Sequence, residues 1–307
     1  MRAWAFVLLA ACATEPEPDP PVDLFDRAWS ESIRAGDLIV AVPGTGMYTD
    51  FGVRVNAAVD PMHPDEPPQI DARDHLGVVE VLEGAIAAAR RAGVDPEAVE
   101  LAIWGAGIKA AAFHYASLDG AAVTFHVVGG KSVCATGGIP DNLTNYNDGN
   151  ADVDARDLYK RLQTFIADRS GARGDDHPGT QVTLVSHSWG GVVAEYFAQN
   201  LAGYISDHGP LAADVTFAIA AGVPGFVPGF TPHGAGFYTV TSSDGDTHGA
   251  VKTYEVNRPD DPAHSFDPAG NGAGHHYIIR FGEDYRGWYG ITTDEMSCGD
   301  VPGVCPN

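Results

Sequence analysis

The stretch Gln181–Gly191, QVTLVSHSWGG, decides the fold that the sequence predicts. Its first part, Val182–Val185, is a short apolar run rich in β-branched residues, which is typical of a strand buried on both faces. Beyond it, apolar residues recur at the spacing of a helix, at Val192, Val193, Tyr196, Phe197 and Leu201. The chain is therefore expected to turn sharply from strand to helix, with Ser188 at the turn.

Such a turn would give Ser188 a reactive position. It lifts the hydroxyl above the sheet, and the small residues Ser186 and Gly190 let the strand and the helix approach without a side-chain clash. The backbone N–H of Trp189, at the start of the helix, then points to where an oxyanion would form. The stretch resembles the nucleophile elbow of the α/β-hydrolase family, in particular that of its lipases and esterases, which have a glycine at the position of Ser186.

The resemblance implies an α/β fold, with a mostly parallel sheet that is covered by helices on both faces. It also implies a catalytic triad in the order nucleophile, acid, histidine. The expected strand Phe237–Thr241 is followed by SSDGDT, and the acid is expected in this turn. Asp246 is favoured because its Gly-Asp-Thr setting is similar to the acid turn of several lipases, and Asp244 stays an alternative. A plain polar turn describes at least one of the two.

The histidine of the triad is expected in the segment GNGAGHHYII, at 270–279. A glycine-rich loop that ends in histidine before an apolar run is similar to the last catalytic loop of the family. His275, which directly follows Gly274, matches the family pattern better than His276, which stays an alternative. His187, inside the elbow, occupies a position that the family uses for packing.

The second donor of the oxyanion hole should follow an early strand. The run DLIVAV, at 37–42, is that strand, and PGTG follows it. Lipases of the family usually have histidine where Pro43 stands, but the group that is needed is a backbone N–H, which Thr45 or Gly46 can supply. No P-loop or dinucleotide-binding pattern is present. Catalysis by such a triad needs no cofactor.

Two further segments bear on ligands. Residues 221–235, AGVPGFVPGFTPHGA, carry Phe226 and Phe230, which we expect either to shape an apolar substrate pocket or to anchor the loop in the core. The oxygen-rich segment Asn145–Asp157 has the composition of a calcium loop, but its register puts Tyr146 at the first ligand position. A polar loop that ends in a helix cap explains it equally well. No cysteine and histidine spacing indicates zinc, so no metal site is predicted.

The N-terminus predicts export. An apolar run, Ala3–Ala11, follows Met1-Arg2 and is too short to span a bilayer. Leu9–Cys12 is similar to a bacterial lipobox, which implies a signal peptide over 1–11 and lipidation of Cys12. Residues 12–25 are rich in proline and acid and are expected to form an extended tether. One domain, 26–307, follows. The expected location is the cell envelope, through a lipid anchor in the membrane, or outside the cell.

The cysteines and the net charge indicate possible disulfides and the kinds of partner that the chain would not bind. Cys298 and Cys305 flank a short loop and are expected to pair in an oxidising envelope, while Cys134 stays free or competes for one of them. The net charge of -23 argues against binding to nucleic acid and to anionic lipid. A solvated exported surface explains the acidic residues, as salt adaptation also would.

Other elements follow from periodicity. Two helices are expected: Leu76–Arg91, closed by Gly93, and Asp154–Ala167, capped by Asp154. The segments 52–75 and 257–274 are expected to be irregular. The remaining strands are expected at Val99–Trp104, Val123–Val128, Val215–Ala220 and Val251–Val256.

These features together predict a serine hydrolase that acts on small-molecule or lipid carboxylic esters. The triad does not distinguish esters from thioesters, amides or peptides, because the pocket makes that choice. A catalytically silent domain that serves as an envelope binding protein is the alternative of another class, and it rests on Ser186 and Pro43 standing where the family has glycine and histidine.

Overall fold

The structure is a computed structural model. It describes residues 36–44, 47–71, 78–91, 93–117, 120–133, 147–173, 181–221, 236–241 and 247–256. Its elements, in chain order, are β1 (Leu38–Val42), α2 (Met47–Ala57), β2 (Gln69–Asp71), α3 (Val79–Arg91), β3 (Glu100–Trp104), β4 (Ala112–Ala116), β5 (Ala122–Gly129), α4 (Asp148–Arg173), β6 (Gln181–His187), α5 (Trp189–His208), β7 (Asp214–Ala221), β8 (Gly236–Thr241) and β9 (Thr247–Val256).

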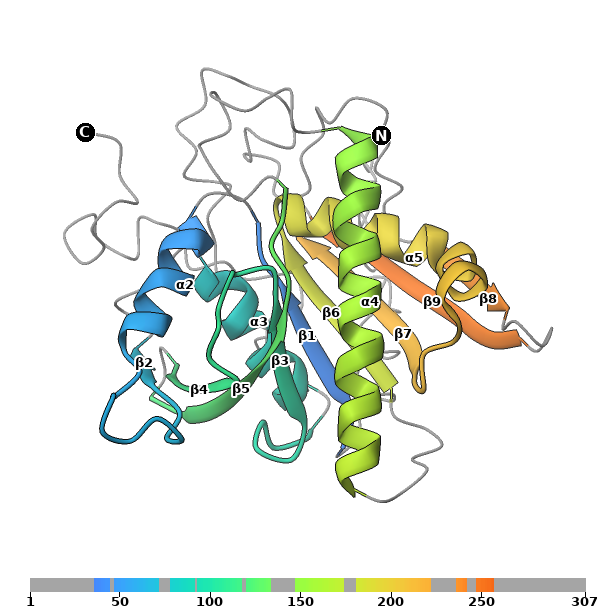
Figure 1. Cartoon of the computed structure of the whole chain (residues 1–307). Coiled ribbons are helices and arrows are strands. Elements are labelled where there is room, and N and C mark those ends of the chain that lie inside the picture. Colours follow the sequence, from blue (N-terminus) through green and yellow to red (C-terminus); the bar gives the residue numbers. More distant parts are fainter. Residues whose placement is uncertain are drawn as a thin grey trace, which may run out of the picture.

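The described strands form one nine-stranded sheet in the order β2-β4-β5-β3-β1-β6-β7-β9-β8 (Figure 1). Six neighbouring strands run parallel, in the spatial order β5-β3-β1-β6-β7-β9. The antiparallel pairings are β4 with β5 and β8 with β9. The predicted α/β class with a mostly parallel sheet is therefore confirmed.

Alternate residues of the central strands face two separate cores, as the pleat of a strand requires. On β1, Ile39 and Ala41 pack with α2 and α3 on one face of the sheet. Leu38, Val40 and Val42 pack with α4 and α5 on the other face. The sheet is therefore covered by helices on both faces, as predicted, and its central strands show no polar alternation because neither face meets water.

The seven expected strands are present, with ends that differ by a few residues at most. Gly93 closes α3 as predicted: it has φ 70, and its N–H donates to Arg90 O at 2.9 Å. Val94 N–H donates to Ala89 O, which completes a Schellman-type end.

The prediction that Asp154 caps a helix is wrong. Helix α4 begins at Asp148, and Asn147 caps it by accepting a bond from Asn150 N–H at 2.9 Å. The described part of the suspected calcium segment is thus the first turns of α4. The polar character of Asp148–Asp152 obscured the start of the helix, because the apolar repeat becomes regular only later.

The expectation that 52–75 is irregular is also wrong in part. Helix α2 reaches Ala57, and the short strand β2 pairs with β4. Strand β4 had not been predicted, although Phe113 and Tyr115 alternate with less buried neighbours. A tight turn, in which Ser117 N–H donates to Ala121 O, joins β4 to β5 as a hairpin.

Candidate active site

Ser188 is the single residue that joins β6, which ends at His187, to α5, which begins at Trp189. Its backbone has φ 56 and ψ -127, and among the described residues no other non-glycine residue has a positive φ. These angles belong to the first central residue of a type II′ turn, which favours glycine. A strained serine at a junction of strand and helix is the local geometry that the sequence predicted for the elbow.

Small residues make this turn possible. A Cβ atom on Gly190 would lie 2.0 Å from Val42 O, so only glycine allows the first turn of α5 to approach the end of β1. Ser186 is fully buried and pairs in register with Val42. The serine therefore fits where the family has glycine.

The segment after β1 lies against the candidate nucleophile. A Cβ atom on Gly44 would come within 2.7 Å of Ser188 Cβ and 3.2 Å of Ser188 Oγ. Thr45 and Gly46, the predicted donors to an oxyanion, lie outside the described residues. Thr45 directly follows Gly44 in the chain, and its role as an oxyanion donor stays a prediction.

Trp189 is fixed by the buried carboxylate of Asp154, for which the sequence predicts the role of a helix cap. Its indole Nε1 donates to Asp154 Oδ2 at 2.8 Å. The same carboxylate accepts bonds from Ser132 Oγ at 2.5 Å and from Val133 N–H at 2.9 Å. Burial raises the pKa of Asp154, against these three hydrogen bonds, which lower it. The overlooked signal is an aspartate on the apolar stripe of α4, beside Ala151, Ala155 and Leu158.

Most other predicted site residues lie outside the described part of the chain. They are Asp244, Asp246, His275, His276, Phe226, Phe230, Cys12, Cys134, Cys298 and Cys305. For the segments that carry the two phenylalanines, the two aspartates and the two histidines, the described strands nevertheless show the edge of the sheet at which each segment begins.

The elbow lies where the parallel strands have their carboxyl ends, and this border of the sheet is here called the edge of the elbow. His187 pairs with Ala221 of β7, which pairs with Val256 of β9. The segment that carries Phe226 and Phe230 leaves β7 at Ala221 and enters β8 at Gly236, which pairs with Thr253 near the same edge. The segment that carries both candidate histidines also leaves from this edge, after Val256.

The acid turn is flanked differently. Strand β8 is antiparallel, so Thr241 pairs with Thr247 at the start of β9. Thr247 and Val256 are the ends of a ten-residue strand, which puts about 30 Å between them. Asp246 is bonded to Thr247, and Asp244 is three residues from it. The assignment of either aspartate stays a prediction, but its flanks are at the edge of the sheet remote from Ser188.

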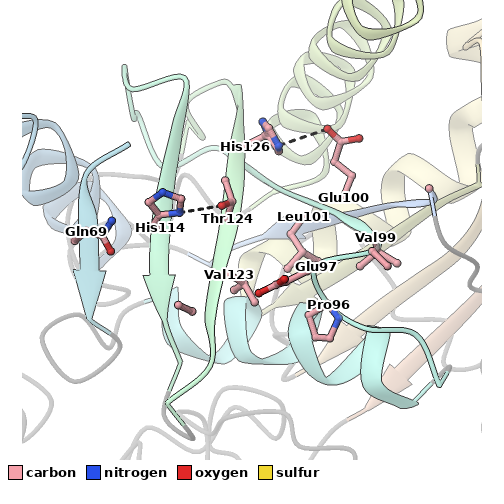
Figure 2. Close-up of a pocket in the computed structure, with 13 residues that line it drawn as sticks. Gln69, Pro96, Glu97, Val99, Glu100, Leu101, His114, Val123, Thr124 and His126 are labelled. Atoms are coloured by element: carbon pink, nitrogen blue, oxygen red, sulfur yellow. Dashed lines mark hydrogen bonds and ion pairs between the residues drawn. The ribbon is translucent and has the colours of Figure 1, made fainter. Parts of the chain in front are cut away.

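A hollow of about 680 Å³ opens at that remote edge (Figure 2). Strands β3, β4 and β5 line it with Glu100, His114, Thr124 and His126, among others. His126 Nε2 lies 3.5 Å from Glu100 Oε1, which also contacts the Arg169 guanidinium. Because Glu100 pairs with Leu38 at the start of β1, this hollow does not serve the elbow.

Two searches of the described residues concern metals and membranes. No group of three or more histidine, cysteine, aspartate or glutamate side chains there could hold a metal ion. No helix among those residues has both the length and the apolar character needed to cross a bilayer.

Comparisons of the chain with protein-family models, with curated proteins and with solved structures found no match. Function therefore has to be inferred from the fold and from the residues of the site.

Proposed function

We propose that the chain is a serine hydrolase of the α/β-hydrolase type that cleaves carboxylic esters. The observation that carries this proposal is the strained backbone of Ser188 between β6 and α5, with Gly44 packed against it. Strain of this kind costs on the order of 1–3 kcal/mol and persists where the surrounding structure enforces it, most often at functional sites.

In the proposed reaction, Ser188 Oγ attacks the ester carbonyl while His275, or its neighbour His276, takes the hydroxyl proton. The backbone N–H groups of Trp189 and Thr45 stabilise the oxyanion. The histidine then gives the proton to the alcohol as it leaves, and an acyl group stays on Ser188. Water, deprotonated by the same histidine, attacks the acyl-enzyme and releases the acid.

The carboxylate that orients the histidine has two possible sources. The sequence favours Asp246 or Asp244, whose flanking strand ends lie at the remote edge of the sheet. The pairing of β9 favours a carboxylate that follows Val256, because that strand end is level with His187. Asp260 and Asp261 are the first acids of that segment. We propose that one of these two completes the triad.

Phe226 and Phe230 would line the acyl pocket, since the strand ends on both sides of their segment are at the edge of the elbow. Replacing both with serine should reduce activity on long-chain esters more than on short-chain esters. Equal losses on both would refute this role.

The proposed setting is the cell envelope. Lipidation of Cys12 would anchor the chain in a membrane, and a Cys298–Cys305 disulfide would hold its C-terminal region. Growth with a radiolabelled fatty acid tests the anchor: the chain should incorporate label, and Cys12→Ala should not. Incorporation by Cys12→Ala would contradict the anchor.

Turnover of matched substrates tests the function. The purified full chain should hydrolyse p-nitrophenyl acetate in a pre-steady-state burst, and the matched thioester and anilide should give lower kcat/KM. Ser188→Ala should abolish turnover while the circular dichroism spectrum stays the same. A folded wild-type chain without turnover on any of the three would favour a silent binding domain instead.

A further inference from the structure

We propose that Asp154 is a positioning residue of the elbow: its carboxylate holds the indole of Trp189 and thereby fixes the backbone N–H of Trp189 toward the reacting carbonyl. This inference rests on the proposed function, because it concerns the geometry of the oxyanion hole.

The hydrogen bonds of Asp154 join three segments of the chain. The carboxylate belongs to α4 and is 1 % exposed, and Trp189 is fully buried. Asp154 Oδ2 accepts both the Trp189 indole N–H and the Ser132 hydroxyl, while Oδ1 accepts the Val133 N–H that follows β5. The carboxylate is thus held by two donors besides the Trp189 indole, one on each of its oxygens.

The indole and the oxyanion donor belong to the same residue. A displacement of the Trp189 backbone would therefore have to move a large side chain that is packed in the core and hydrogen-bonded at its far end. Oxyanion stabilisation depends on donors that need no reorganisation during the reaction. An error of about 1 Å in such a group can cost about 100-fold in rate.

The same helix provides a matched control. One turn further along α4, Asp157 Oδ2 accepts a hydrogen bond from the Trp104 indole at 3.0 Å. The chemistry and the helix are the same, but Trp104 ends β3 and is not bonded to the nucleophile. A general effect of removing a carboxylate–indole pair should appear equally at both sites.

The test compares Asp154→Asn, Trp189→Phe and the double variant with Asp157→Asn and Trp104→Phe, all in the full chain. Each is assayed for thermal stability and for kcat and KM on p-nitrophenyl acetate. Asp154→Asn and Trp189→Phe should each lower kcat about ten-fold or more, with KM within about two-fold. The double variant should be no slower than the slower single variant, because both changes remove the same constraint. The variants at 157 and 104 should lower stability and leave kcat within about two-fold.

Unchanged kcat in folded Asp154→Asn would overturn this inference, as would losses that multiply in the double variant or that appear only in KM. An equal loss of kcat in Asp157→Asn would also overturn it, since the effect would then be general. If Asp154→Asn does not fold, Trp189→Phe decides the matter, because it keeps the carboxylate and an aromatic side chain in the core and removes the indole N–H donor. A wild-type chain without turnover would instead overturn the proposed function itself.

Discussion

Gly44 packs against Ser188 so closely that a Cβ atom on Gly44 would lie 2.7 Å from Ser188 Cβ. The contact joins the end of β1 to the turn between β6 and α5, two segments far apart in sequence. In the proposed function, it is the point at which an oxyanion donor after β1 and the nucleophile would meet.

Gly44→Ala should therefore impair the nucleophile. The added methyl group has to displace Ser188, so kcat/KM for p-nitrophenyl acetate should fall by about ten-fold or more. Gly203→Ala in α5 is the control, because a Cβ atom at Gly203 meets nothing within 4 Å. Gly203→Ala should keep full activity. Its free energy of unfolding should be about 1 kcal/mol higher than that of the wild type, because alanine favours a helix more than glycine does. Full activity in Gly44→Ala would show that the close contact has no part in catalysis.

The strain at Ser188 predicts a stability difference between two inactive variants. Glycine at position 188 adopts a positive φ without strain, whereas alanine in Ser188→Ala keeps the strain. We expect Ser188→Gly to be more stable by about 1 kcal/mol in urea unfolding. Ala202→Gly, on the exposed part of α5, replaces alanine by glycine at a helical position. Its free energy of unfolding should be about 1 kcal/mol lower than that of the wild type. If glycine in place of alanine lowered the free energy of unfolding equally at positions 188 and 202, the elbow would carry no strain.

Under the proposed function, the sheet register predicts which carboxylate completes the triad. Asp260→Asn or Asp261→Asn should lower kcat by at least about 100-fold, because the histidine loses its orienting partner. Asp244→Asn and Asp246→Asn should leave kcat within about two-fold. The reverse pattern would restore the assignment made from sequence, and would require the turn between β8 and β9 to reach the edge of the elbow.

Asp154 predicts a pH dependence of stability. Its pKa is raised in the folded chain, chiefly by burial, above the ordinary aspartate value of 3.8 that applies to the unfolded chain. As pH rises, the unfolded chain therefore releases this proton first. The stabilisation that the protonated group provides is complete below the unfolded pKa and is lost as pH rises through the folded pKa. The free energy of unfolding of the wild type, relative to Asp154→Asn, should thus fall as pH rises from about 4 toward neutral. A difference that stays constant or grows would contradict a raised pKa.

The sequence predicted the central part of the fold well. Residues such as Leu38–Val42 form apolar runs without alternation, and burial on both faces leaves such runs few other conformations. The edge strands were harder to predict, because β2 has three residues and β4 depends on its hairpin partner. The start of α4 was missed because its first turns are polar and are held by a cap and by Asp154, which is a tertiary feature.

The site was predictable where its chemistry is local. Ser188, Ser186 and Gly190 form one short motif, and the turn follows from it. Which carboxylate would face the histidine of the proposed triad depends instead on strand direction, and the antiparallel course of β8 cannot be seen in the run FYTVT. The bond between Asp154 and Trp189 joins residues 35 positions apart, and periodicity cannot find such a pair.

The measurement that tests the central claim most directly is the site of a covalent adduct. The full chain is treated with a fluorophosphonate, digested, and mapped by mass spectrometry alongside Ser188→Ala and Ser186→Ala. We predict one adduct, on Ser188, that is absent from Ser188→Ala and retained in Ser186→Ala. An adduct on another residue, or none on the folded wild-type chain, would contradict the claim that Ser188 is an activated nucleophile.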